Sequence, residues 1–394
     1  MKNLVSIVRC ETYDDTEVLN GLRSSLDLIG GIHTLVKEGH RVLLKPNLLQ
    51  GKPQEKAVTT HPSIVRGLIR IVREAGGVPS IGDSPGIGSC LRAAEKAGIA
   101  KVAQEMDCPL VELDRPVLPE KRQGRYFRQL EIDQTVLEAD VVINLPKWKT
   151  HAMMLLTLGV KNMFGCVPGP RKALWHLKAG EDRTLFARML VDVYRIVRPS
   201  LTVLDGVVGM EGNGPGSGNP VHLGLIMASR DAFSLDQVVC DLLRVPGQSL
   251  PTNQVAMEDG LTGDGFEVVG LPVAQVKIPK FELPPFCGLT WGLPFLMRMG
   301  LKNALTSKPI SDEAVCIGCE RCVEICPPHA LKREGERLAF DYKKCIRCFC
   351  CQEICPEGAI SIKPGWASRI VGGTWSVAGG QEKGQRKKNR EQKK

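Results

Sequence analysis

The sequence predicts an α/β fold for residues 1–280, a large sheet covered by helices, followed by a small second domain. Two patterns support this fold class. Runs of consecutive apolar residues are typical of strands buried on both faces of a sheet, and amphipathic stretches of helical length separate most of them. A third observation predicts the small domain, because nine of the fifteen cysteines lie between positions 316 and 355.

Strands and helices are expected to alternate along the large domain. The expected strands are the apolar runs 4–10, 41–46, 78–83, 140–146, 201–209 and 222–229. The expected helices are the stretches 16–30, 63–77, 91–99, 184–198 and 234–245. In such a sheet, ligands bind at the carboxyl ends of the strands, so the polar loops that follow the strands are expected to form the functional edge.

Positive charge is concentrated in the forty residues between Asp140 and Glu181, which include six Lys or Arg, two His and no carboxylate. Cations buried together near strand ends repel one another unless an anion joins them. We therefore favour a site for a phosphate or carboxylate ligand over the alternative, a solvated basic face. The sequence letters PKWKTH follow the strand at 140–146 and lie at the edge where α/β sites form.

The basic residues of this stretch have regular spacings. Lys147 and Lys149 alternate on an extended segment, with His151 in step. A helix is expected to start near position 154 and to carry Lys161. A further helix is expected to carry Lys172 and His176, which are four residues apart. Either histidine has the chemistry of a proton shuttle.

The glycine-rich segment 206–218 fits no nucleotide-binding motif. It lacks the GxxxxGK[ST] pattern, and Ser217 stands where GxGxxG would need its third glycine. Two interpretations of this segment remain: an anion-binding site formed by backbone amides, or a plain flexible loop.

Charge and hydropathy exclude several classes of partner. The net charge is +9, but the last twelve residues carry seven Lys or Arg and one Glu. The rest is close to neutral and the chain has 5% aromatic residues, which argues against nucleic-acid binding. No segment reaches the roughly 18 apolar residues of a membrane span, and the N-terminus lacks a signal-peptide pattern. We expect a cytoplasmic protein with no membrane span, an apolar Pro-rich linker at 281–307 that packs against one of the domains, and a disordered basic tail at 366–394.

Eight of the clustered cysteines form two groups with the spacing C-x2-C-x2-C-x3-C-P. The segments 312–331 and 341–360 match at an offset of 29, with ten of twenty positions identical. This spacing brings three thiolates to one [4Fe-4S] cluster and directs the fourth to the other cluster. Structural zinc does not explain the triple spacing, the proline or the repeat. Residues 308–365 thus resemble the bacterial two-cluster ferredoxin, a small α+β fold.

The spacing also assigns the ligands of two [4Fe-4S] clusters. The first cluster is expected to bind Cys316, Cys319, Cys322 and Cys355. The second is expected to bind Cys345, Cys348, Cys351 and Cys326. The ninth cysteine, Cys350, breaks both spacings and is expected to be a small buried residue without a metal.

Residues 1–250 resemble a known family through a set of motifs in a fixed order. The motifs are KPNLL, TTHP, IGDSPG, LPKWKTH, GVKNMFG, RKALWH and DGVVGMEGNGP. As a set they are similar to the family called domain of unknown function 362, whose members often carry a C-terminal two-cluster ferredoxin module. The recurrent polar positions of the family correspond to Lys45, Asn47, Asp83, Lys147, Lys149, His151, Lys161, Asn162, Lys172, His176, Asp205, Glu211 and Asp231. The resemblance implies no particular activity.

Two hypotheses for function follow. In the first, the protein is an oxidoreductase whose clusters exchange electrons with an anionic substrate or cofactor in the α/β domain. The expected substrate-binding residues are Lys45, Asn47, Lys147, Lys149, Lys161, Asn162, Lys172, Asp205 and Glu211, and the expected catalytic residues are His151, His176 and Asp83. In the second, it is an electron carrier without catalytic activity, whose basic loops dock an acidic redox partner protein. Redox sensing by the clusters is a third possibility that the sequence leaves open.

Overall fold

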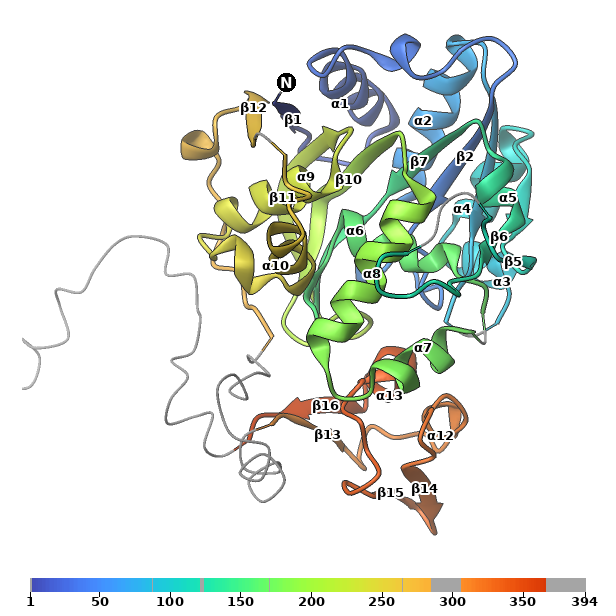
Figure 1. Ribbon diagram of the computed structural model, residues 1–394, viewed down its shortest axis with the longest axis vertical. Helices are drawn as coiled ribbons and strands as arrows, with labels where there is room; N and C mark the ends of the chain where they lie inside the picture. Colours follow the sequence, from blue (N-terminus) through green and yellow to red (C-terminus); the bar gives the residue numbers. More distant parts are fainter. Residues whose placement is uncertain are drawn as a thin grey trace, which may run out of the picture.

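The computed structural model describes residues 2–86, 88–120, 124–169, 171–263, 265–284 and 306–365. It contains a large mixed sheet covered by helices, and a small module of residues 306–365 that packs against one end of it (Figure 1). Most of the predicted linker at 281–307 and all of the predicted tail at 366–394 lie outside the described residues. No helix in the described part of the chain is long and apolar enough to cross a membrane.

The ten-stranded sheet has the order β12–β1–β11–β10–β7–β2–β3–β4, with β8 and β9 attached beside β10. Its parallel part is formed by β10 (Leu201–Glu211), β7 (Val141–Leu145), β2 (Arg41–Pro46), β3 (Val78–Asp83) and β4 (Leu110–Glu112). On the other side of β10 lie β11 (Asn219–Ser229) and β1 (Asn3–Arg9), both antiparallel to their neighbour, and then β12 (Phe266–Gly270). The sheet therefore has one shared carboxyl edge at its parallel part.

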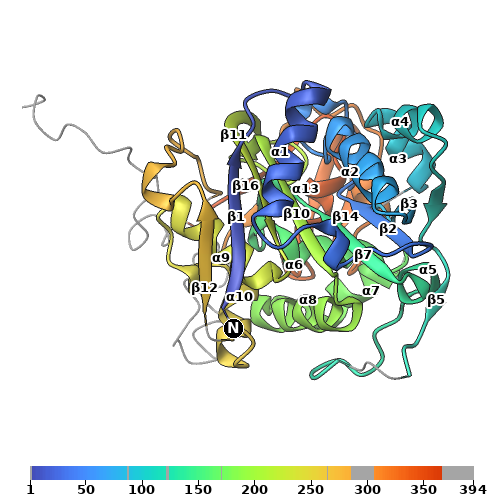
Figure 2. The ribbon, with the colours of Figure 1, turned by 90° about the horizontal axis from the view of Figure 1, so that it is seen from above.

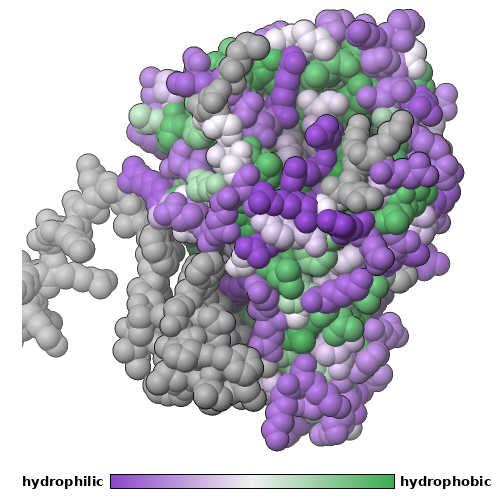
Figure 3. Space-filling model, in the orientation of Figure 1, coloured by the Kyte–Doolittle hydropathy of each residue, from purple (hydrophilic) through white to green (hydrophobic). Residues whose placement is uncertain are grey.

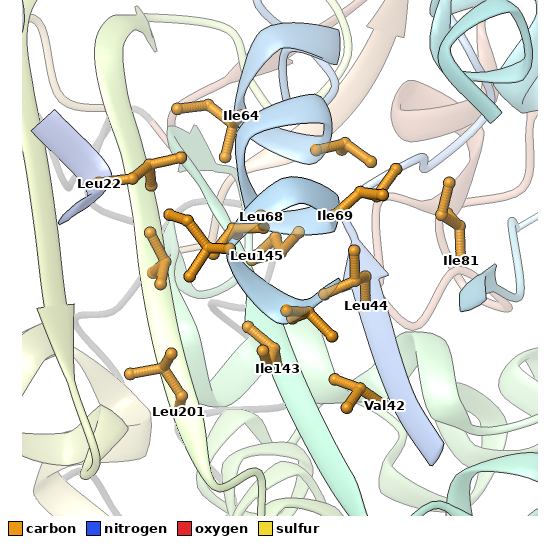
Figure 4. Packing of buried hydrophobic residues seen from close by; sticks show 14 of the residues in the cluster. Leu22, Val42, Leu44, Ile64, Leu68, Ile69, Ile81, Ile143, Leu145 and Leu201 are labelled. Atoms are coloured by element: carbon orange, nitrogen blue, oxygen red, sulfur yellow. The ribbon is translucent and has the colours of Figure 1, made fainter. Parts of the chain in front are cut away.

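Helices cover both faces of the sheet (Figure 2). One face carries α1 (Asp15–Asp27), α2 (Pro62–Glu74), α3 (Cys90–Lys96) and α4 (Ile99–Glu105). The other carries α5 (Gln134–Glu138), α6 (Gly159–Asn162), α7 (Arg171–Ala179), α8 (Arg183–Val197), α9 (Ala232–Leu242) and α10 (Pro251–Glu258). The strand side chains alternate between the two layers: Leu44 packs in the α2 layer, which Figure 4 shows, and Leu43 packs in the α8 layer. This double burial confirms the α/β prediction.

The module is built from two small antiparallel sheets and two short helices. The sheets pair β13 (Lys308–Ser311) with β16 (Ile360–Lys363), and β14 (Leu331–Glu334) with β15 (Arg337–Phe340). The helices are α12 (Arg321–Glu324) and α13 (Cys350–Ile354). Left-handed backbone recurs at pairs 29 residues apart, namely Gly318 and Arg347, Glu320 and Phe349, and His329 and Gly358. The sequence repeat is therefore also a repeat of backbone conformation.

Three local expectations were wrong. The helix expected from position 154 begins only at Gly159, because the apolar residues before it form β9 (Leu155–Thr157), which pairs with β8 (Lys147–His151). The helix expected at 91–99 is two helices, separated at Gly98, which has a φ of 76°. The segment 206–218 is a loop only in its second half, because β10 continues to Glu211 and pairs with β11.

Candidate functional site

A cavity of about 120 Å³ lies at the carboxyl edge of the parallel strands, between the α/β domain and the module. The lining residues from the α/β domain include Lys45, Asn47, Asp83, Lys149, Lys161, Asn162, Lys172 and His176. The lining residues from the module are Ile325, Cys350, Glu353 and Ile354. The structure thus brings together eight of the predicted site residues, and it places the cysteine-rich module directly against them.

Lys45 and Asp83 form a buried ion pair in the wall of this cavity. They come from the ends of neighbouring strands, β2 and β3, and Lys45 Nζ lies 2.8 Å from Asp83 Oδ1. Asp83 also accepts a hydrogen bond from the backbone N–H of Leu48 through Oδ2, at 2.8 Å. A Cβ at Gly165 would overlap both charged groups, so the glycine that ends GVKNMFG is needed for their close approach. Asp83 is therefore placed to hold Lys45 in position.

Three asparagines extend this wall into a buried amide network. Asn47 Nδ2 donates to Asn162 Oδ1 at 2.8 Å, and Asn162 Nδ2 donates to Asn144 Oδ1 at 2.8 Å. Lys149 Nζ donates to Asn47 Oδ1 and to the carbonyl of Val58, each at 2.7 Å. Lys149 is fully buried, and its burial lowers its pKa well below the ordinary value. It has neutral hydrogen-bond partners and no ion pair among the described residues.

Lys161 and Lys172 also face the cavity without a carboxylate in contact. Lys172 Nζ donates to the carbonyl of Ser84 at 2.7 Å, and burial lowers its pKa to about 7 although Asp83 acts in the opposite direction. The ammonium group of Lys161 forms no hydrogen bond or ion pair with another residue in the part of the chain that the structure describes. Burial lowers its pKa, against the opposing effect of Glu353. Both ammonium groups are available to a ligand.

Glu353 brings a carboxylate from the module to this group of cations. Its Oε1 lies 2.8 Å from His151 Nε2, although the contact is not aligned as a hydrogen bond. His151 Nδ1 accepts from the backbone N–H groups of Met153 and Met154, so the neutral ring carries its proton on Nε2. Burial lowers the pKa of His151 to about 4. Burial acts to raise the pKa of Glu353, but His151 and Lys161 lower it to about 2, so the carboxylate is ionised.

His176 is the histidine that lines the cavity itself. Its ring stacks on Phe186 with the centroids 4.3 Å apart, and its buried Nδ1 has no hydrogen-bond partner among the described residues. Burial lowers the pKa of His176 to about 4, so the ring is neutral at pH 7. His151 lies behind Glu353 and is not part of the lining.

Lys147 and Asp205 do not reach the cavity. Lys147 Nζ lies 2.8 Å from Asp205 Oδ2 and also donates to Tyr13 Oη at 2.6 Å. Asp205 accepts from the Tyr13 hydroxyl at 2.7 Å and from the backbone N–H of His61 at 2.8 Å. This closed network joins β8 to β10 and α2. Sequence reasoning did not single out Tyr13, which lies in none of the motifs, or His61, which lies in the motif TTHP.

Two further acidic residues are placed elsewhere. Glu211 accepts a hydrogen bond from the backbone N–H of Glu282 at 2.7 Å, and Asp231 caps α9 by accepting from the N–H of Ser234. Trp148, which lies between Lys147 and Lys149, is fully buried in a hydrophobic cluster with Phe281. The acid-free stretch therefore finds its carboxylates outside itself, in Asp205 beside Lys147, Glu131 beside Arg171 and the module's Glu353 beside His151.

The glycine-rich loop after β10 holds the module in place. Gln352 Nε2 donates to the carbonyls of Asn213 and Gly214 at 2.9 and 3.0 Å. From the loop after β2, Gln50 Nε2 donates to the carbonyl of Glu353 at 2.9 Å, and Lys52 donates to that of Pro356. The loop thus contacts the module, and the N–H of Gly214 also donates to Thr150 Oγ1 of β8.

Seven of the eight motif cysteines gather in two neighbouring places of the module, and Cys322 and Cys355 contact both of them, so the division into two ligand sets stays a prediction. Cys316, Cys319, Cys322 and Cys355 line one cavity, whereas Cys326, Cys345 and Cys351 pack in one buried cluster. Among the described residues, no group of three or more His, Cys, Asp or Glu is close enough to hold a metal ion. Backbone N–H groups of Ala330 and Ala359 donate to Cys326 Sγ and Cys355 Sγ, each at 3.2 Å. Thiol donors with N–H···S bonds fit the chemistry of iron–sulfur ligands.

The two sets differ in exposure. Cys326, Cys345, Cys348 and Cys351 are buried. In the other set Cys319 is exposed and its three companions are half-buried. Cys350 is buried, as expected, and its place in the cavity lining was not expected.

Comparison with known proteins defines the class to which this fold and site belong. The family model "Domain of unknown function (DUF362)" matches residues 42–241, and a 4Fe-4S dicluster domain matches residues 308–356. The chain is 40% identical over 316 residues to "Thylakoid-associated protein sll1697" of Synechocystis sp., covering 77% of this chain and 95% of that protein. The chain therefore belongs to the DUF362 family and carries a C-terminal 4Fe-4S dicluster domain, as the motifs predicted.

Solved structures are more remote. The lactate racemase apoprotein from Thermoanaerobacterium thermosaccharolyticum has a TM-score of 0.41 and 11% identity, covering 62% of this chain and 57% of that one. A protein from Thermotoga maritima has a TM-score of 0.37 and 10% identity, covering 64% of this chain and 60% of that one. The chain thus spans less than two thirds of either structure.

Proposed function

We propose that this protein is an iron–sulfur oxidoreductase that exchanges electrons between two [4Fe-4S] clusters and an anionic substrate or cofactor. The dicluster domain supports an iron–sulfur electron-transfer role. The anionic substrate or cofactor is supported by one observation, the composition of the cavity. Lysines of the α/β domain and α13 of the module line it. A bound molecule there would lie between the basic wall and the cysteine-rich module.

We assign the buried cysteine set to the cluster nearer to this cavity. Two lining residues, Ile325 and Cys350, directly precede Cys326 and Cys351 of the buried set, whereas one, Ile354, directly precedes Cys355 of the other set. The more exposed set, Cys316, Cys319, Cys322 and Cys355, would hold the outer cluster and meet a redox partner protein. When bound, the two clusters supply single electrons.

The charges in the cavity wall favour an anion. Four lysines line it together with two carboxylates, Asp83 and Glu353. If all six groups are charged, an excess of two positive charges is left for a ligand to balance. Lys149, Lys161 and Lys172 would bind the anion, and the free Nδ1 of His176 would hydrogen-bond to it or move a proton.

The carrier alternative is supported less well. It uses the basic loops as a docking surface for an acidic partner, but Lys45, Lys147 and Lys149 are at most 1% exposed. A cytoplasmic location also stays a prediction, since the relative sll1697 is named as thylakoid-associated.

The proposed activity is tested by following electrons out of the reduced protein. The protein is purified without oxygen, reduced with dithionite, freed of excess reductant, and mixed with the small-molecule or the protein fraction of a cell extract. Electron paramagnetic resonance then reports reoxidation of the clusters. We expect the small-molecule fraction to reoxidise the wild type, and Lys161→Met to react much more slowly.

The matched control is Lys178→Met, because Lys178 is exposed on α7 and does not line the cavity. It should behave like the wild type. Reoxidation by the protein fraction alone would favour a carrier. Equal rates for Lys161→Met and the wild type would show that the site is not in this cavity.

A further inference from the structure

A second cavity adjoins the lysine-lined one. It has a volume of about 560 Å³, and four residues, Gly86, Gly169, Ala173 and Ile325, line both cavities. The two spaces are therefore neighbours along the junction between α7 and the module. We refer to them as the inner cavity and the outer groove.

The outer groove differs from the inner cavity in chemistry. Leu174 and Leu177, three residues apart on α7, line it and are 47% and 45% exposed. Pro85 of the α/β domain and Ile325 and Pro327 of the module add further apolar surface. Glu324 and His329 of the module also line it, and no lysine or arginine appears among the described residues of its lining. Figure 3 shows hydrophobic surface where the module meets the α/β domain.

The inner cavity is too small to hold a large molecule by itself. Its 120 Å³ is comparable to an engineered protein cavity of about 150 Å³ that takes up benzene. An anionic group of a few heavy atoms fits there, and any larger ligand has to continue into the outer groove. A ligand lying in the groove would also pass Cys326, which lines it.

We infer that the inner cavity and the outer groove form one site for an amphipathic anion, with the anionic head at Lys149, Lys161 and Lys172 and an apolar body against Leu174 and Leu177. This inference rests on the proposed anion site and adds the chemical class of its ligand. The groove also explains why two leucines stand exposed on one face of α7, since burial of apolar surface by a ligand body is favourable. The body would lie beside the buried cysteine set.

The test measures binding of homologous anions to the intact, cluster-loaded protein by titration calorimetry. The probes are inorganic phosphate, the n-alkyl phosphates from ethyl to octyl, and the n-alkanoates of the same lengths. We expect the affinity to rise by about fourfold for each methylene that becomes buried. Whichever head group binds more tightly, phosphate or carboxylate, identifies the head of the ligand.

Two sets of variants separate head from body. Leu174→Gln combined with Leu177→Gln should remove the dependence on chain length and leave the affinity for inorganic phosphate unchanged. Lys161→Met should weaken all probes with a phosphate head by a similar factor. Leu91→Gln is the control, because Leu91 is a leucine 51% exposed on α3 that does not line the groove.

The outcomes distinguish the two proposals. If inorganic phosphate or a short alkanoate binds through Lys161 but chain length has no effect, the amphipathic ligand is wrong and the anion site stands. If the chain-length effect persists in the double leucine variant, the groove assignment is wrong. If no probe binds, or Lys161→Met binds them all as the wild type does, the anion site itself is refuted.

Discussion

Lys147 and Lys149 are two residues apart in β8, both are at most 1% exposed, and yet they lie in different environments. Lys147 is paired with Asp205 and hydrogen-bonded to Tyr13, in a network that does not line the cavity. Lys149 meets neutral oxygens and lines the cavity. The same residue type in one strand is thus part of an ion-paired network at one position and faces the proposed ligand site at the other.

The two lysines suggest how a buried lysine that stabilises the fold differs from one that is placed to bind a ligand. When a buried charge has an ion-pair partner, the attraction between the two charges offsets much of their desolvation cost. Removing one partner then destabilises the fold, because the other charge is left buried and unpaired. A buried ammonium with neutral partners carries an uncompensated desolvation cost, which a bound anion would offset. The two kinds of lysine are distinguished by their ion-pair and hydrogen-bond partners, and not by how deeply they are buried or where they lie in the sequence.

The largest expected effect is on stability. Lys147→Met leaves Asp205 buried without its cation, and we expect the free energy of unfolding to fall by about 3–5 kcal/mol. Lys149→Met removes a buried ammonium that has no carboxylate partner but leaves the oxygens of Asn47 and Val58 without this donor, so the two effects oppose each other and the loss should stay within about 2 kcal/mol. Urea unfolding of protein with matched iron content, followed by tryptophan fluorescence, measures both. Equal losses would remove the distinction between the two lysines.

A smaller effect, of opposite pattern, is expected on anion binding. Lys149→Met and Lys161→Met should each weaken the binding of sulfate by roughly tenfold, the loss of one charge-assisted hydrogen bond. Lys147→Met, measured under conditions where it stays folded, should bind sulfate as the wild type does. Titration calorimetry provides the affinities. A loss in Lys147→Met as large as in Lys149→Met would contradict separate roles.

The smallest expected effect is a pH dependence that comes from Lys172. Its pKa of about 7 means that its ammonium form is lost as the pH rises through neutrality. Sulfate remains a dianion over this range, so its affinity should fall by up to about tenfold between roughly pH 6 and pH 8. Lys172→Met should bind weakly at every pH and show a flat profile. A wild-type profile that rises with pH would mean that another group controls binding.

The sequence predicts the parts of this protein that depend on local patterns. Apolar runs predicted β2, β3 and β7 within a residue or two, and the cysteine spacing predicted the 4Fe-4S dicluster domain. The run before Lys161 was misassigned, because a short apolar run suits a strand or a helix equally and here the pairing of β9 with β8 decides.

Local sequence patterns could not predict the hydrogen-bond and ion-pair partners of the basic residues, because these partners are distant in the sequence. Glu353 lies about two hundred positions after His151, inside a motif that cluster binding already explains. Tyr13 and His61 reach Lys147 and Asp205 only because β1, α2 and β10 meet in the folded sheet. One signal was present: a stretch with six cations and no acid needs carboxylates from elsewhere in the chain.

If the anion site exists as proposed, an anion binds in the inner cavity beside the buried cysteine set. Electron–nuclear double resonance on the reduced protein, loaded with inorganic phosphate, measures whether a phosphorus nucleus lies close to a cluster. We expect a phosphorus coupling in the wild type that disappears in Lys161→Met and persists in Lys178→Met. Phosphate that is bound, as calorimetry shows, but gives no coupling would place the anion away from the clusters and contradict the account.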